Sequence, residues 1–157
     1  MKLASLRNET RDGQLIVVNR QLTQATAVPD IAPTLQFALE NWDSCAPKLE
    51  QVFLQLQQGK IDQVFAFNTA DAAAPLPRSY HWADGSAYVT HVELVRKARN
   101  AELPDSFWTD PLMYMGASDA FIGAEDNILV ESEDWGIDFE SEVAVFTDDV
   151  PAGVTHD

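Results

Sequence analysis

The sequence contains a single cysteine, few basic residues and no long hydrophobic run. Because Cys45 is alone, the chain can form neither an internal disulfide nor a cysteine-based zinc site. No apolar stretch approaches the length of a membrane-spanning helix, and the apolar run within residues 1–7 is too short for a signal peptide. We therefore expect a protein of the reducing cytoplasm that has no membrane partner.

Positive charge is scarce throughout the chain. Ten Lys and Arg against 25 Asp and Glu give a net charge of −15, and residues 125–157 contain no Lys or Arg. Nucleic-acid phosphates are bound by clustered Lys and Arg, and anionic membranes repel an acidic surface, so we expect neither partner. The hydrophobic fraction of 46% over 157 residues is typical of a globular protein of one domain, or of a small domain plus part of another.

Residues 1–70 have the pattern of a small domain with strands and helices. An Asp-Gly pair between apolar runs is a hairpin signal, and the runs predict strands over residues 3–7, 14–18 and 21–28. Apolar spacing predicts a short helix over residues 34–42. A second, amphipathic helix would have Ser44 as its N-cap and end near Gly59.

Residues 71–78 are rich in Ala and Pro without a usable period, so they predict a linker. We therefore expect a second domain over residues 79–157. Its pattern predicts a helix from about 86 to 99, and strands over residues 112–115, 128–130 and 137–146.

The alternation along residues 135–145 is the most informative pattern, because it predicts a strand with two chemically different faces. One face carries Phe139, Ser141, Val143 and Val145, and the other carries Asp138, Glu140, Glu142 and Ala144. Neighbours on one face of a strand lie about 7 Å apart, so the carboxylates repel one another. Full solvation relieves that repulsion, as does a hard cation such as Mg²⁺, Ca²⁺ or Mn²⁺. The spacing alone leaves both explanations open.

Other candidate residues have ordinary structural explanations when each is considered alone. Asp84 precedes Gly-Ser at a predicted helix start, which is typical of a cap or turn residue. His91 lies on the apolar face of that helix, where a histidine is more often a core residue. Tyr114 could be an ordinary strand aromatic. No nucleotide-binding, serine-hydrolase or zinc-protease motif appears.

Three segments together resemble the fumarylacetoacetate hydrolase family. The first runs from Asp84 to His91 and is similar to the family segment in which an acidic metal ligand precedes the catalytic histidine by seven residues. The second, Asp110-Pro111-Leu112-Met113-Tyr114-Met115-Gly116, resembles the family's Pro-x-x-Tyr-x-Gly substrate-contacting strand. The third, residues 138–145, resembles the family's paired-glutamate strand. The residues before the linker also look like the small non-catalytic domain of some bacterial members.

The resemblance implies hydrolysis of a carbon–carbon bond in a small-molecule β-diketo acid of the acylpyruvate or fumarylacetoacetate type. It implies that Mg²⁺, Ca²⁺ or Mn²⁺ is held by three carboxylates, Asp84, Glu140 and Glu142. His91 would take a proton from the attacking water, and Tyr114 and Ser86 would contact the substrate. Other branches of the family carry out decarboxylation or isomerisation on the same metal platform.

The fold implied is α+β: a small N-terminal domain of mixed helices and strands, followed by the first part of a mixed β-roll catalytic domain. Family members continue well beyond residue 157 and supply another ligating Asp and a Lys there, so we expect this chain to be an incomplete and inactive portion. Short members also orient their histidine with a Glu three residues later, where this chain has Leu94. A homodimer is possible for the full-length protein. The alternative is a truncated, non-enzymatic relative that retains acidic metal-binding residues.

Overall fold

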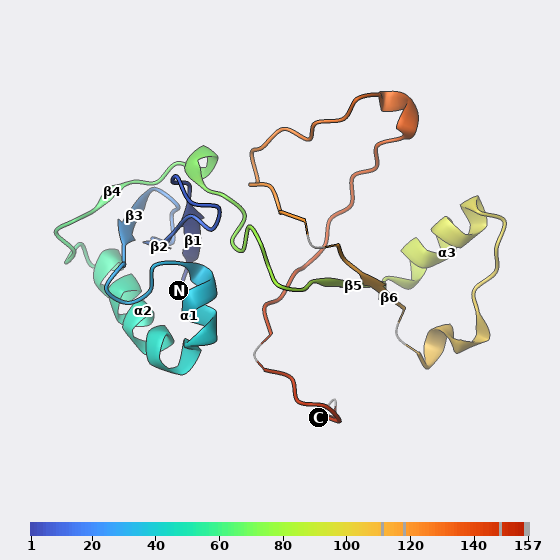
Figure 1. The fold of residues 1–157 in the computed structure, drawn as a ribbon, viewed down its shortest axis with the longest axis horizontal. Coiled ribbons are helices and arrows are strands. Elements are labelled where there is room, and N and C mark those ends of the chain that lie inside the picture. Colours follow the sequence, from blue (N-terminus) through green and yellow to red (C-terminus); the bar gives the residue numbers. More distant parts are fainter. Residues whose placement is uncertain (111, 118, 148, 156–157) are drawn as a thin grey trace.

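The chain has an α+β fold in which most of the regular structure lies in its N-terminal half (Figure 1). The structure is a computed structural model that describes residues 1–110, 112–117, 119–147 and 149–155. A four-stranded antiparallel sheet and two helices make up the N-terminal half, and a two-stranded ribbon and one helix follow. None of the helices in the described part of the chain is long and apolar enough to cross a bilayer.

The N-terminal sheet has the strand order β1-β2-β3-β4. Its strands are β1 (Leu3–Leu6), β2 (Gln14–Val18), β3 (Gln24–Ala27) and β4 (Phe65–Ala66). The predicted hairpin is confirmed, because Leu3 pairs with Val17 and Leu6 with Gln14. Gly13 closes the hairpin at a φ of +66°, and a Cβ there would lie 2.6 Å from the Leu6 carbonyl oxygen, so the turn requires glycine.

Two consecutive helices, α1 (Leu35–Glu40) and α2 (Trp42–Gln57), cover one face of this sheet. Asn41 ends α1 by donating its N–H to the Ala38 carbonyl, and it is also the N-cap of α2. The prediction that Ser44 caps α2 is therefore wrong, because the break between the helices falls at Asn41. Gly59, at a φ of +65°, follows the end of α2 as predicted.

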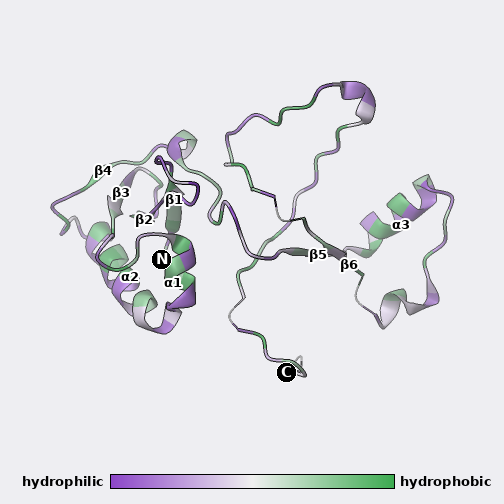
Figure 2. Cartoon of the chain, viewed as in Figure 1, coloured by the Kyte–Doolittle hydropathy of each residue, from purple (hydrophilic) through white to green (hydrophobic). Residues whose placement is uncertain are grey.

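The hydrophobic core lies between β2 and α2. Leu15 and Val17 of β2 are fully buried with Leu49, Phe53 and Leu56 of α2. The other face of β2 buries Ile16 and Val18 in a smaller cluster. Both helices turn apolar residues toward this core, and hydrophilic residues make up most of their remaining surface (Figure 2). Their apolar spacing thus accounts for how they pack.

Residues 71–75, within the predicted linker, run along the open edge of β1. Arg7 donates its N–H to the Asp71 carbonyl at 2.9 Å, and Ala73 donates to Ser5 at 2.9 Å. The Ser5 hydroxyl donates to the Pro75 carbonyl at 2.6 Å. A short 3₁₀ turn, η1 (Thr69–Asp71), leads into this stretch. The segment is therefore held against the N-terminal sheet.

The second half contains a short ribbon and a helix. The ribbon pairs β5 (Ala83–Gly85) with β6 (Met113–Met115), and the helix is α3 (Val89–Ala98). The predicted strand over 112–115 is confirmed as β6. The predicted helix starts later than expected, because the Ser86 N–H donates to Leu112 and continues the ribbon. Two further 3₁₀ turns are η2 (Asp105–Trp108) and η3 (Glu133–Trp135).

The strands predicted over residues 128–130 and 137–146 are wrong: both stretches lack strand pairing in the described part of the chain. They form the long irregular path drawn in orange and red in Figure 1. Alternation decides which side chains share a face, but a strand also needs a hydrogen-bonded neighbour, and among the described residues none pairs with these stretches. Their large side chains are exposed, with Leu129 at 89% and Phe139 at 84%.

Candidate active site

The β5–β6 ribbon places two of the predicted site residues opposite each other. Asp84 of β5 pairs in register with Tyr114 of β6. Asp84 is half-buried, and its Oδ1 atom is fully buried without a hydrogen-bond partner in the described part of the chain. The Tyr114 side chain is 58% exposed. An unpaired, buried carboxylate oxygen is costly unless a donor or a cation completes it.

Trp82 fixes the ribbon beside these residues. Its indole Nε1 donates to the Ala117 carbonyl at 3.0 Å, and its ring lies 5.8 Å from the Tyr114 ring, centroid to centroid. A Cβ at Gly116 would overlap the indole, so glycine lets the ring lie against the backbone that directly follows β6. Trp82 therefore forms a wall that orients Tyr114.

The predicted catalytic histidine lies beside a predicted metal ligand. His91, in the first turn of α3, has its Nε2 atom 3.3 Å from Oε1 of Glu140, and both side chains are about half-exposed. The neighbouring Val92 is buried. The two residues form an ion pair when the histidine is protonated. This contact joins α3 to the acidic segment, which lies far along the sequence.

The three predicted metal ligands are not assembled into one centre. In the described ranges, no group of three or more His, Cys, Asp and Glu side chains is close enough to hold a metal ion. Asp84 lies on the ribbon, and Glu140 lies against α3. The reason is that residues 137–146 do not pair with the ribbon as a strand, so Glu140 and Glu142 are not held at a fixed register.

Two family models match consecutive parts of the chain. Residues 1–78 match the model described as fumarylacetoacetase N-terminal domain 2, and residues 80–156 match the fumarylacetoacetate (FAA) hydrolase C-terminal model. The chain belongs to the fumarylacetoacetate hydrolase family. No curated protein matches the chain. This membership confirms the family resemblance found in the sequence and makes the protein a member of a hydrolase-type family.

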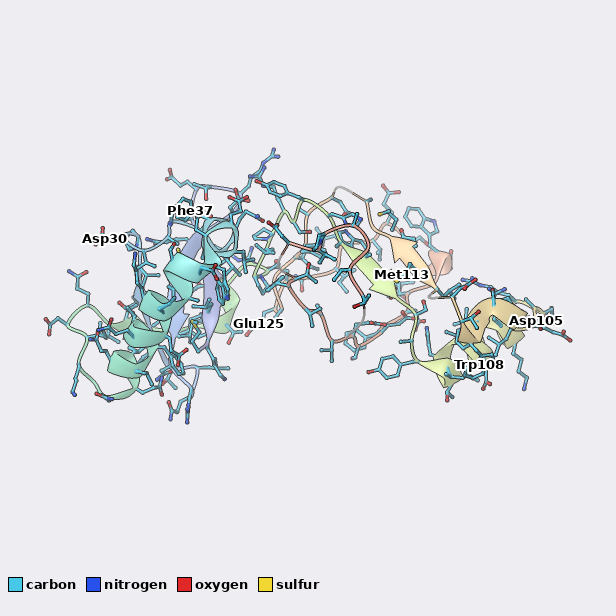
Figure 3. The ribbon with its side chains drawn as sticks, turned by 90° about the horizontal axis from the view of Figure 1, so that it is seen from below. Asp30, Phe37, Asp105, Trp108, Met113 and Glu125 are labelled. Atoms are coloured by element: carbon cyan, nitrogen blue, oxygen red, sulfur yellow. The ribbon has the colours of Figure 1, made fainter. Side chains whose placement is uncertain are left out.

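Ser86 lies away from the other predicted site residues of this family member, because it lines a separate cavity. It lines a cavity of about 430 Å³ together with Phe107, Trp108 and Leu112. In the described part of the chain, Asp84, His91 and Tyr114 do not line that cavity. Figure 3 shows Trp108 at the η2 end and Met113 on the ribbon. Pro111, the first residue of the family-like Pro-x-x-Tyr-x-Gly pattern, lies outside the described residues.

Sequence reasoning did not anticipate that Glu140 would contact His91. Leu94 stands where short family members have the orienting Glu, and Glu93 is only two positions from His91, which puts it on another side of the helix. Sequence spacing could not reveal this contact, because His91 and Glu140 are far apart in the sequence and meet only in the folded chain.

Proposed function

We propose that the protein is a metal-dependent hydrolase that cleaves a carbon–carbon bond in a β-diketo acid such as an acylpyruvate. The observation that carries this proposal is the 3.3 Å contact between His91 and Glu140, because it brings two of the family-like segments together in space. The proposed partner is this small-molecule substrate, with neither nucleic acid nor a membrane. A homodimer is also proposed.

The proposed metal is Mg²⁺, Ca²⁺ or Mn²⁺. Asp84, Glu140 and Glu142 would hold it, and their oxygen-only donor set suits a hard divalent cation. The buried Oδ1 of Asp84, which lacks a protein partner in the described part of the chain, supports this fit. When bound, the metal would supply Lewis-acid polarisation of a substrate carbonyl and charge stabilisation for the leaving enolate.

The protein's own residues would move protons and orient the substrate. His91 would take a proton from water as the water oxygen bonds to the substrate carbonyl carbon. The carbon–carbon bond then breaks, and the leaving enolate carbon receives the proton that His91 took from the water. Tyr114, held against Trp82, would position the substrate above Asp84. Ser86 lines the separate cavity beside Trp108, so its proposed contact would be with a part of the substrate that extends away from Asp84.

Calorimetric titration with Mg²⁺, Mn²⁺ and Ca²⁺ tests the metal site directly. Removing a residue that only contacts a metal ligand costs roughly 10- to 100-fold in metal affinity. Glu140 and Glu142 are proposed as direct ligands, so we expect Glu140→Gln/Glu142→Gln to lose at least as much. Glu131→Gln/Glu133→Gln is the matched control, because it removes the same charge from exposed residues nearby. If both variants lose the same affinity while circular dichroism is unchanged, the metal binds through the overall negative charge of the chain. Glu140 and Glu142 would then not form a specific site.

A second measurement separates the hydrolase from a non-enzymatic relative. Acylpyruvate is added to the metal-loaded chain, and its consumption is followed by absorbance. We expect His91→Gln to lower turnover far more than it lowers metal affinity, because His91 moves a proton and is not a proposed ligand. Turnover that falls in His91→Gln would exclude the non-enzymatic alternative. If metal affinity falls and turnover per bound metal does not, His91 is a structural residue.

A further inference from the structure

An ion pair joins the N-terminal sheet to the segment that follows the ribbon. Arg7, directly after β1, donates from Nη2 to both carboxylate oxygens of Asp126 at 2.6 Å each. The same nitrogen donates to the Ala72 carbonyl at 3.1 Å. The side chains of Arg7 and Asp126 are 44% and 31% exposed, so the pair is partly shielded from water. A partly exposed ion pair contributes little by itself, so the contacts around it must supply the rest of the support.

The turn that carries Asp126 is shaped to make this contact. The Gly123 N–H donates to Oδ2 of Asp126 at 2.6 Å, and the Asp126 N–H donates to the Gly123 carbonyl at 3.1 Å. Gly123 is buried, and a Cβ there would lie 2.6 Å from the Ala72 carbonyl oxygen. Glycine is therefore needed for the close approach. The hydrogen bonds from Arg7 and Gly123 lower the pKa of Asp126 below its ordinary value. Figure 3 shows Glu125 of this turn beside the N-terminal sheet.

Charge explains why the turn reaches back to the N-terminal sheet. No Lys or Arg lies between Arg99 and residue 157, and the acidic turn after the ribbon is paired with a cation from the N-terminal half. Arg7 supplies that cation. A second ion pair, in which Arg78 donates to both oxygens of Asp12 at 2.9 and 2.6 Å, ties the start of the second half to the hairpin turn.

The turn is connected back to the ribbon by backbone and ring contacts. The Phe121 N–H donates to the Pro77 carbonyl at 2.9 Å. The Phe121 ring lies 5.6 Å from the Trp82 ring, edge to face, and Trp82 in turn contacts Tyr114. These contacts form an unbroken series from Arg7 to the ribbon that carries Asp84.

We propose that Arg7 and Asp126 are positioning residues, through which the N-terminal sheet holds residues 119–126 and, by way of Phe121 and Trp82, orients the ribbon. The N-terminal domain then acts as a support for the candidate site, although it contributes no group to the chemistry. The role of this support in catalysis rests on the proposed function. The support can be tested independently, because it is measurable in the chain without metal or substrate.

The test compares Arg7→Gln, Asp126→Asn and the double variant with Arg11→Gln, by amide hydrogen exchange and by the tryptophan indole resonances. Arg11→Gln is the matched control, because Arg11 is an exposed arginine of the same hairpin with no ion pair in the described part of the chain. We expect the Phe121 and Gly123 amides to exchange about tenfold faster in each single variant. The double variant should cost less than the sum of the two single variants, because both lose the Arg7–Asp126 pair, although Arg7 also contacts Ala72 and Asp126 also accepts from Gly123.

The indole N–H of Trp82 gives the decisive signal. It donates to Ala117, so it should shift when the support is lost, while the indole of Trp42, which packs against the N-terminal core, should not move. Arg7→Lys, which keeps the charge, should restore part of the wild-type shift. If Trp82 and the Phe121 amide are unchanged in Arg7→Gln, the proposal is overturned. If the Trp42 indole resonance shifts as well, Arg7→Gln has disturbed the N-terminal fold. The Trp82 resonance of Asp126→Asn, which leaves β1 intact, then decides the outcome.

Discussion

Replacing Leu49 with Ala tests whether α2 presents its apolar stripe to the sheet as described. The Leu49 side chain is completely buried and lies in the cluster formed with Leu15, Val17 and Phe53. Removing a buried leucine side chain costs about 2–5 kcal/mol, because transfer energy is lost and a cavity remains. Since Ala is the better helix former, the helix itself is not weakened.

The same substitution on the opposite side of α2 provides the control. Leu54 is 48% exposed, so Leu54→Ala should change the free energy of unfolding by no more than about 0.5 kcal/mol. Both variants would be unfolded in urea and by heat, with far-ultraviolet circular dichroism as the signal. The lower limit of the Leu49→Ala cost is about 2 kcal/mol. For the N-terminal domain of residues 1–78, this corresponds to a fall in Tm of at least about 8 °C.

The comparison between the two variants decides the outcome. If Leu49→Ala and Leu54→Ala cost the same, α2 does not bury the face described, and the argument from apolar spacing fails. A change in the urea dependence of Leu49→Ala, at a constant midpoint, would point instead to an altered unfolded state. The expected result is a shifted midpoint with the urea dependence unchanged.

Two further predictions concern the hairpin. Gly13→Ala should cost more than Gly59→Ala: both glycines have positive φ, which costs a non-glycine residue about 1–2 kcal/mol, but only at Gly13 would a Cβ also lie 2.6 Å from a carbonyl oxygen. Urea unfolding of the two variants measures this, and equal costs would contradict it. The hydrogen bond from Arg78 lowers the pKa of Asp12 in the folded state, so the pair stabilises the fold above the unfolded-state pKa of about 3.9 and is lost as the pH falls through the lower folded value. Carboxyl chemical shifts of Asp12 should show its midpoint rise in Arg78→Gln, and an unmoved midpoint would show that the ion pair does not form in solution.

The N-terminal fold could be predicted from the sequence where the determinants are local. The Asp12-Gly13 turn lies between its two strands, and the stripe that includes Leu49 and Phe53 repeats at helical spacing. The start of α2 was predicted wrongly, since Asn41 serves both helices and such sharing depends on how they pack together.

The candidate site was less predictable because its parts meet through non-local contacts. Asp84 was found by its family-like spacing to His91, and its register opposite Tyr114 required the pairing of β5 with β6. The alternation around Glu140 is real in the sequence, yet it produced no strand in the described residues, because a strand is a property of a pair. The contact between His91 and Glu140 follows from neither pattern.

Residues 71–75 determine where the N-terminal domain can be cut from the rest of the chain. β1 is the outer strand of its sheet, and residues 71–75 occupy the hydrogen-bonding groups along its free side. An outer strand left uncovered is a template for pairing with other molecules. A piece cut after residue 70 would expose β1 and would be prone to self-association, whereas a piece that extends to residue 78 would retain its own edge cover.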